Sequence, residues 1–235
     1  DITDKKNAEL ELEKQNQRLE SLVEITRSIN LHSIPSQVML QAIRELVKMT
    51  GADGGTGCLY DPDSFSLEIA ASQGVSQLFL ERLSKRIQGA SLIRNTVESG
   101  KGFLVKETKT DTSFNSDVAR SEGIECIISV PLISEGKSFG CITIHSKTAN
   151  KLTEKDFDLV EAASHQISVA LKKAEFLSNE RKAATSMASL YKLSHEVAKY
   201  LTPRDIAFHS FPIINEEISC KRMWLGTINE AKTHI

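Results

Sequence analysis

The sequence predicts an α+β fold built on an antiparallel sheet, and three observations support this prediction. Between Ala52 and Ser146 the apolar residues alternate as they do in strands, whereas the flanking segments follow a helical period. Two strongly apolar runs, 125–133 and 138–146, are joined by the short turn Glu135-Gly136-Lys137, which is typical of a hairpin. Strands that follow one another in this way, with helices before and after them, indicate an antiparallel sheet.

The first fifty residues predict two helices. Pro35 suits the first turn of the second helix, Ser36–Thr50, because its missing N–H has no partner to lose there, and Gly51 can end it. The first helix, within residues 1–30, carries apolar residues at heptad spacing. We expect a parallel homodimer through this seam and the outer stripe of the last helix, formed by Leu12, Leu19, Leu22, Ile29, Val160, Ile167 and Leu171.

The middle of the chain predicts a hairpin, two short helices, a strand, a polar loop and a helical turn. These elements are expected in that order at 56–72, 76–87, 91–100, 102–107, 108–116 and 116–123. Thr153 is a plausible N-cap for a last helix with acidic residues in its first turn. That helix continues towards Tyr200 without Gly or Pro, and Phe157, Val160, Ile167 and Leu171 form its predicted buried stripe.

Composition predicts a soluble, reduced, cytoplasmic protein. Lys and Arg total 29 against 31 for Asp and Glu, and no stretch is strongly basic, which argues against nucleic-acid binding. No uncharged run approaches the ~18–20 residues that a membrane-spanning helix needs. The four cysteines (58, 126, 141 and 220) share no close spacing, which argues against a disulfide framework or a zinc site.

An internal repeat explains the C-terminal part of the chain. Shifted by 168 positions, residues 22–51 lie without gaps over 190–219, so that Leu22 falls on Leu190 and Pro35 on Pro203. The stretch "SHEVAKYLTP" is similar to the phosphoacceptor box of sensor histidine kinases, but the repeat places its His195 on Arg27, an ordinary helix position. We therefore expect His195 not to accept a phosphoryl group.

Two motifs identify a family resemblance. "SVPLISEGKSFGCITIHS" resembles the closing hairpin of GAF domains, and "NTVESGKGFLVKETKTDTSF" is similar to the helix, strand and loop that precede it. The opening "DITDKK" resembles the end of a PAS domain. The resemblance implies a GAF-like sheet with helices on both faces and four segments: a PAS exit and coiled-coil helix at 1–20, a GAF domain at 21–177, a connecting helix at 178–188, and the truncated start of a second GAF domain at 189–235.

The family resemblance implies a small-molecule pocket between the sheet and the helices that cover one face of it. Side chains alternate between the two faces of a strand, and we assign Ile142 and Ile144 to the face covered by the terminal helices. The residues between them in the sequence then face the pocket. The predicted pocket residues are, from the strands, Cys126, Ile128, Cys141, Thr143 and His145, and, from the cover, Phe79, Val97, Phe103, Phe114 and Val118. A filled core without a ligand is the alternative.

Residue types argue against most of the family's known cofactors. Bilin-binding relatives carry an adjacent Cys-His pair, which this chain lacks, and Glu161-Ala162 stands where cyclic-nucleotide relatives have an acidic pair. No histidine lies between Leu67 and Cys126, where haem-binding relatives place an axial ligand. Haem therefore remains an alternative only through His145 or Cys126.

The resemblance implies a non-catalytic sensory and dimerisation module, the input region of a sensor histidine kinase, with the effector domain in the same chain. Alternative parents are a diguanylate cyclase and a transcription regulator. The alternative function is enzymatic, that of a free methionine sulfoxide reductase. Such an enzyme needs thiols close enough to exchange disulfides, and Cys58, Cys126 and Cys141 could approach one another on adjacent strands. These cysteines do not match the cover-borne spacing of that enzyme family.

Overall fold

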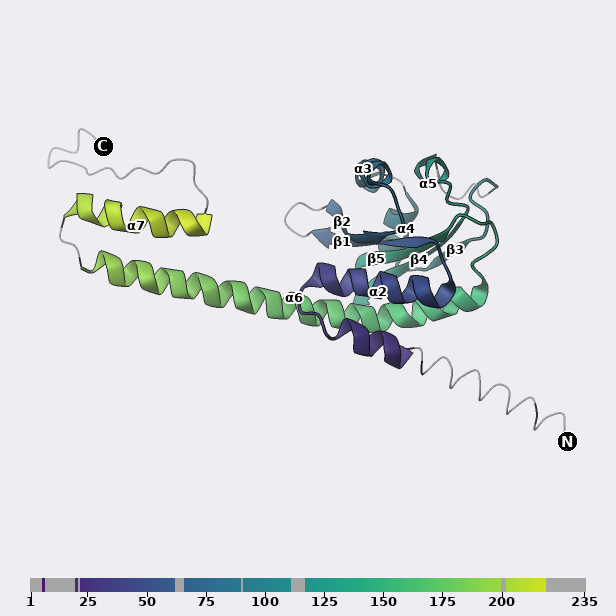
Figure 1. The fold of residues 1–235 in the computed structure, drawn as a ribbon, viewed down its shortest axis with the longest axis horizontal. Coiled ribbons are helices and arrows are strands. Elements are labelled where there is room, and N and C mark those ends of the chain that lie inside the picture. The colour runs from purple at the N-terminus through teal and green to yellow at the C-terminus, as the bar shows by residue number, and fades with distance from the viewer. Residues whose placement is uncertain are drawn as a thin grey trace. The chain divides into compact units, whose positions relative to one another are not determined.

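The computed structural model describes residues 6, 20, 22–61, 66–89, 91–110, 117–199 and 202–218. The chain divides into two compact units, Asp1–Phe176 and Leu177–Ile235. Figure 1 shows the elements of each unit. Among the helices that the structure describes, none combines the length and the apolar character needed to span a membrane.

The first unit is built on a five-stranded sheet with the order β2-β1-β5-β4-β3, and every neighbouring pair is antiparallel. The strands are β1 (Gly54–Asp61), β2 (Ser66–Gln73), β3 (Phe103–Val105), β4 (Cys126–Ser134) and β5 (Lys137–Ser146). Glu135 and Gly136 both have positive φ values, 52° and 75°, which is the geometry of a type I′ hairpin turn. The predicted α+β fold with an antiparallel sheet is confirmed.

Two helices, α2 (Pro35–Thr50) and α6 (Glu154–Val197), cover one face of the sheet, which we call the α2/α6 face (Figure 1). Pro35 occupies the first turn of α2, and Gly51 ends the helix with φ at 63°, as predicted. The helical residues 22–29 pack into the same core through Ile25 and Ile29. This layer holds the larger hydrophobic core of the protein.

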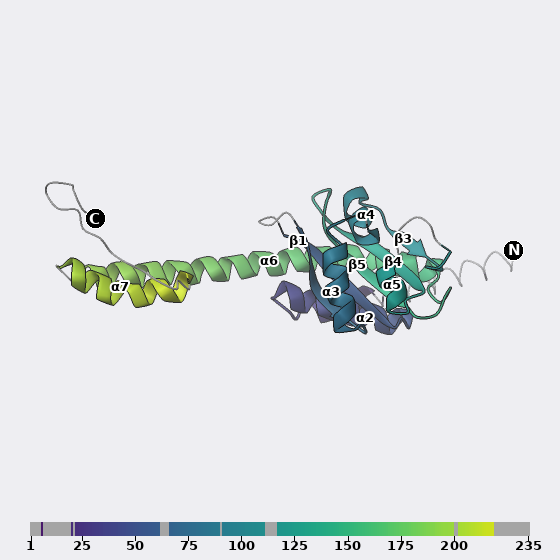
Figure 2. The same cartoon turned by 90° about the horizontal axis from the view of Figure 1, so that it is seen from above.

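Three shorter helices cover the opposite face, and we call them the lid: α3 (Gln77–Arg86), α4 (Leu92–Ser99) and α5 (Asp117–Ser121). Seen from above, they lie over the strands (Figure 2). Ser76 and Ser91 cap α3 and α4, because each side-chain oxygen accepts a hydrogen bond from a backbone N–H of the first turn. The lid therefore encloses a second, smaller core against the sheet.

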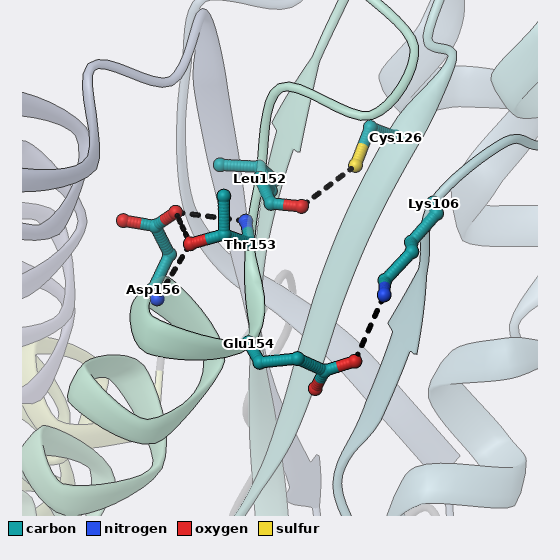
Figure 3. Close-up of polar contacts among 6 residues, drawn as sticks. All are labelled: Lys106, Cys126, Leu152, Thr153, Glu154 and Asp156. Atoms are coloured by element: carbon teal, nitrogen blue, oxygen red, sulfur yellow. Dashed lines mark hydrogen bonds and ion pairs between the residues drawn. The ribbon is translucent and has the colours of Figure 1, made fainter.

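Helix α6 starts at a capping arrangement that also ties it to the end of β3 (Figure 3). The Thr153 N–H and hydroxyl both donate to Asp156 Oδ2, at 2.8 and 2.6 Å. Lys106, directly after β3, pairs with Glu154 at 3.0 Å. Phe157 and the buried Val160, Ile167 and Leu171 then face the sheet, so the predicted cap and buried stripe are confirmed.

Glycines in β1 allow α2 to approach the sheet closely. A Cβ atom at Gly57 would lie 2.2 Å from Met39 Sδ, and one at Gly55 would lie 3.0 Å from Ile43 Cγ2. Met39 and Ile43 are both fully buried. The glycine-rich sequence of β1 thus supplies the space that the α2 side chains occupy.

The second unit contains the C-terminal part of α6 and helix α7 (Pro203–Ile218), in which Ser210 and Ile213 are buried. Helix α7 lies 168 positions after α2 and has the same length of 16 residues. The predicted uninterrupted helix towards Tyr200 is confirmed, since α6 continues to Val197. The second GAF-like copy stays a prediction, and its expected strand region lies outside the described residues.

We expect Gly57→Val to lower the free energy of unfolding by about 1–3 kcal/mol, because the new side chain overlaps Met39 in a filled core. Gly89→Val is the matched control, since a Cβ there meets nothing closer than 3.8 Å. Urea unfolding followed by circular dichroism would measure both. Equal stability of the two variants would contradict the close packing of α2 on β1.

Candidate functional site

A cavity of about 60 Å³ lies between the sheet and the lid. Strands β1, β4 and β5 form its floor, and all three lid helices contribute to its wall. The lining residues are Thr56, Phe79, Leu83, Arg86, Ser91, Leu92, Ile93, Val118, Ala119, Ile124, Ile127, Thr143 and His145. This volume is enough for a few water molecules and is far below the ~300–1,000 Å³ of pockets for drug-sized ligands.

Strand β5 places alternate residues on the two faces of the sheet. Ile142 and Ile144 belong to the core of the α2/α6 face, while Thr143 and His145 line the cavity. Cys141 points to the same side as Thr143 and packs in the smaller core beneath the lid. The predicted parity of β5 is therefore confirmed, and the ligand role of these residues stays a prediction.

The predicted assignment of β4 side chains to the two faces of the sheet is wrong. Cys126 and Ile128 lie in the core of the α2/α6 face, and the Cys126 thiol points to the Leu152 carbonyl oxygen at 3.9 Å (Figure 3). In an antiparallel pair, residues directly opposite each other share a face. Ile127 lies opposite His145, and Cys126 lies opposite Ser146, so the cavity receives Ile127 instead.

His145 is the most unusual group of the cavity. The side chain is 1 % exposed, and neither Nδ1 nor Nε2 has a hydrogen-bond partner among the described residues. Burial lowers the pKa of His145 from 6.5 to about 4, so the imidazole is neutral at physiological pH. Its ring packs edge-on to Phe79, with centroids 6.4 Å apart, and it lies over Gly54, where a Cβ atom would approach Cε1 to 2.6 Å.

Two carboxylates near His145 are already engaged with other groups. Asp53 Oδ2 accepts hydrogen bonds from the Ser146 hydroxyl and the Lys147 N–H, at 2.7 and 2.8 Å, and these bonds lower the pKa of Asp53. Glu122, directly after α5, accepts from the N–H and hydroxyl of Ser76, both at 2.7 Å. Burial raises the pKa of Glu122, but the Ser76 bonds outweigh it and the pKa is lowered. The Ser76–Glu122 bonds join α3 to α5 across the lid.

A row of hydroxyl groups borders the cavity floor. The Thr96 and Ser129 hydroxyls are 2.8 Å apart, and Ser129 lies 3.4 Å from the Thr143 hydroxyl, which is a long contact. Thr56 lies opposite Thr143 on β1. The floor therefore offers hydroxyl and imidazole groups, and the rest of the lining is apolar apart from Arg86 and Ser91.

Four of the predicted pocket residues line the cavity, namely Phe79, Val118, Thr143 and His145. Val97 and Phe103 pack against the smaller core but not on the cavity wall, and Phe114 lies outside the described residues. The sequence reasoning missed Arg86 and Ser91, at the end of α3 and the start of α4. Strand pairing could have identified Thr56 and Ile127, because they lie opposite Thr143 and His145.

The three cysteines that the structure describes do not form a nucleophilic site. Cys58 and Cys141 lie opposite each other on β1 and β5, both fully buried and free. A hydrogen bond between their thiols, together with burial, raises the pKa of Cys58 well above its usual range, which suppresses the reactive thiolate. Burial also raises the pKa of Cys126, which lies on the other face of the sheet. The three thiols are therefore not assembled at the cavity.

The described residues and the volume of the cavity do not favour a metal or haem site. Within the described ranges, no group of three or more His, Cys, Asp or Glu side chains could hold a metal ion. Cys126 cannot act together with His145, because the sheet separates them. The small cavity volume does not fit a haem group at His145.

The predicted dimer seam is wrong where the structure describes it. Ile29, Val160, Ile167 and Leu171 are at most 2 % exposed and pack into the core of the first unit, so they are not available to a second protomer. Leu22 is partly buried against the same core. Leu12 and Leu19 lie outside the described residues.

The model of the family described as "GAF domain" matches residues 35–172 of this chain. The chain belongs to the GAF domain family. GAF domains are sensory modules that occur in histidine kinases, phytochromes and other proteins. The matched range begins at the first residue of α2 and ends within α6, so it contains the whole sheet, the lid and the cavity of this GAF domain.

Solved structures share the GAF fold at low sequence identity. A bacteriophytochrome from R. palustris has a TM-score of 0.61 at 12 % identity, over 87 % of this chain and 46 % of that one. The free methionine-R-sulfoxide reductase from Neisseria meningitidis, in complex with its substrate, has a TM-score of 0.57 at 18 % identity, over 69 % and 92 %. A domain assigned to a two-component sensor histidine kinase of Sinorhizobium meliloti 1021 has a TM-score of 0.50 at 14 % identity, over 62 % and 93 %. A comparison with curated proteins finds no match.

We expect the unfolding free energy of the GAF domain to fall by roughly 3 kcal/mol between pH 6.5 and about 4 because of His145. The unfolded protein takes up a proton below pH 6.5, whereas the folded protein resists protonation until about pH 4. The contribution is fully present above pH 6.5 and is lost as the pH falls.

Urea unfolding as a function of pH would measure this effect as the difference between wild type and His145→Gln. Asp53 and Glu122, whose pKa values are both lowered, remain in the variant, so their own hydrogen bonds to Ser146, Lys147 and Ser76 are common to the two proteins. His165→Gln, which removes an exposed histidine of α6, is the control and should keep the fall. An unchanged pH dependence in His145→Gln would contradict the buried neutral imidazole.

Proposed function

We propose that this GAF domain is the small-molecule sensory module of a cytoplasmic signal-transduction protein, the input region of a sensor histidine kinase. The observation that supports this role most directly is the buried His145 beside the cavity, whose two ring nitrogens have no hydrogen-bond partner in the part of the chain that the structure describes. Leaving such polar groups unpaired in an apolar interior is costly, so an occupant of the cavity that bonds to them would stabilise the domain.

Helix α6 is the proposed output element. Its first part, from Val160 to Ala174, packs on the α2/α6 face of the sheet, and the same helix continues to Val197 without interruption. A ligand would act by binding two arrangements of this helix with different affinity, since binding can shift an equilibrium only through such a difference. An effector domain in the same chain would receive the change. Diguanylate cyclases and transcription regulators are alternative parents.

An enzymatic role as a free methionine sulfoxide reductase is less well supported. The similarity to the Neisseria enzyme concerns the fold alone, at 18 % identity. Thiol chemistry of that kind needs a reactive thiolate and a second thiol that can reach it. Here Cys58 and Cys141 are buried with the pKa of Cys58 raised, and Cys126 lies on the opposite face.

We also propose that the protein forms a homodimer through the outer side of α6. Val169, Phe176 and Leu190 are 61–68 % exposed and follow one another at multiples of seven residues, with Ala183 between the last two. In a helix, position 169 points roughly opposite the buried position 167. An apolar residue at every seventh position is typical of a seam that pairs with another helix.

Filling the cavity tests the sensory role. We expect a panel of small metabolites to contain compounds that raise the melting temperature of the wild type but not of Thr143→Phe, because the added ring occupies the ligand space. Ligand at a hundredfold excess over its Kd stabilises a protein by about 2.7 kcal/mol, which thermal unfolding detects readily. Thr148→Phe, in the exposed turn after β5, is the control. If no compound stabilises the wild type, or if each stabilises both variants equally, the pocket is not a sensory site.

Charge substitution tests the dimer. Phe176→Lys combined with Leu190→Lys should convert the dimer to a monomer in analytical ultracentrifugation, because like charges would face each other at the seam. Leu78→Lys alters an exposed leucine on α3 and should sediment like the wild type. A monomeric wild type, or a double variant that remains dimeric, would exclude this interface.

A further inference from the structure

The lining of the cavity includes a positively charged side chain. The half-buried Arg86, in the last turn of α3, lines the cavity, and its guanidinium has no ion pair among the described residues. Arg94 lies nearby in sequence but is already engaged with Glu98 at 2.9 Å and with the Ile87 carbonyl oxygen. Arg86 is therefore the cation of the wall that can pair with a ligand.

The start of α4 contributes to the same wall. Ser91, Leu92 and Ile93 line the cavity in succession, and they form the N-cap and the first two positions of the helix. The Ser91 hydroxyl oxygen accepts a hydrogen bond from the Arg94 N–H, whereas the N–H groups of Leu92 and Ile93 have no acceptor within the helix. Such N–H groups and the helix dipole favour an anion.

No carboxylate offsets this charge on the described wall of the cavity. Asp53 and Glu122, the acidic groups that interact with His145, do not line it and are hydrogen-bonded to Ser146, Lys147 and Ser76. Apart from Thr56, Thr143 and His145, the remaining lining is apolar, with Phe79, Leu83 and Val118 among its residues. A cavity of this kind suits an organic anion with carbon atoms better than a fully hydrated inorganic ion.

His145 adds a second, uncharged recognition group. Its buried neutral ring has one nitrogen that donates and one that accepts, and neither is paired with another described residue. A hydroxyl group can donate or accept, and a carbonyl oxygen can accept, so either would form a bond with this ring. The volume of about 60 Å³ favours a small ligand.

We propose that the cavity binds a short hydroxy- or oxo-carboxylate, with the carboxylate held by Arg86 and the first turn of α4 and the hydroxyl or carbonyl group bonded to His145. This inference rests on the proposed sensory role of the cavity and names the class of its ligand. Charge-assisted hydrogen bonds to Arg86 supply most of the affinity, and His145 selects for the second polar group.

The test uses matched probes. Lactate, glycolate and pyruvate are titrated into the wild-type chain, and binding is measured by isothermal titration calorimetry. Three control compounds are titrated in the same way: lactamide lacks the charge, propionate lacks the hydroxyl group, and nitrate lacks carbon. We expect at least one of the three acids to bind, and lactamide and propionate to bind at least about tenfold more weakly than that acid, the loss expected for one hydrogen bond to a charged group.

Substitutions of Arg86 and His145 separate the roles of these two recognition groups. Arg86→Gln should raise the Kd of the acid at least about tenfold and leave that of the amide unchanged, whereas Arg82→Gln, an exposed arginine one turn earlier on α3, is the matched control. His145→Leu should remove the preference for lactate over propionate. Arg86→Gln and His145→Leu are first checked for wild-type circular dichroism. Arg86→Lys, which keeps the charge, should retain measurable binding.

Each outcome decides between the two proposals. If neutral compounds of the metabolite panel stabilise the wild type but not Thr143→Phe, and the acids do not bind, the sensory site stands and the carboxylate class is overturned. Binding of nitrate as tightly as lactate, or acid binding that Arg86→Gln does not weaken, also overturns the class. If no compound binds in a manner sensitive to Thr143→Phe, the sensory role itself fails.

Discussion

Strand β5 has a neighbouring strand on each edge and protein on both faces, and the rest of the domain is arranged around this constraint. Every residue from Gly140 to Ser146 is buried. On the α2/α6 face the strand presents isoleucines to a filled apolar core, but on the lid face it presents Thr143 and His145. Because these two side chains are polar, apolar lid side chains packed directly against them would supply no hydrogen-bond partners. The cavity lies beside these two polar groups.

The sequence was sufficient to predict the fold and the faces of β5 but not those of β4. In β5 the hydrophobic and polar residues alternate, so the parity can be read directly from Cys141 to His145. In β4 every residue from Cys126 to Leu132 is buried, and a strand that is covered on both faces reads as a continuous apolar run without a period. Only the pairing of Ile127 with His145 fixes which residues face the lid, and this pairing is set by the hairpin turn and the register of the whole sheet.

The same kind of ambiguity affected the helices. Helix α6 has an apolar stripe on each of two sides, one with Val160 and Ile167 and another with Val169 and Phe176. A helical period identifies both stripes but cannot say which one meets the sheet, because that depends on where β4 and β5 present their own apolar residues. Arg86 and Ser91 were beyond prediction for a related reason: they come together at the cavity only because α3 and α4 are both packed on the lid face. The repeat was more informative, since α2 and α7 each begin at a proline and lie 168 positions apart.

The contact between Gly57 and Met39 has a consequence for the evolution of this domain. The space that a side chain at position 57 would need is filled by a side chain from α2, not by backbone, so the two positions share one volume. A larger residue on the strand becomes compatible with the fold when the helix residue is shortened, and a shorter helix residue in turn leaves room that a strand side chain can fill. At Gly54, by contrast, a Cβ atom would lie 2.4 Å from the backbone carbonyl oxygen of Gln73, and no change of another side chain relieves that overlap. Among homologous sequences, positions 39 and 57 should therefore co-vary in size, whereas position 54 should be invariant.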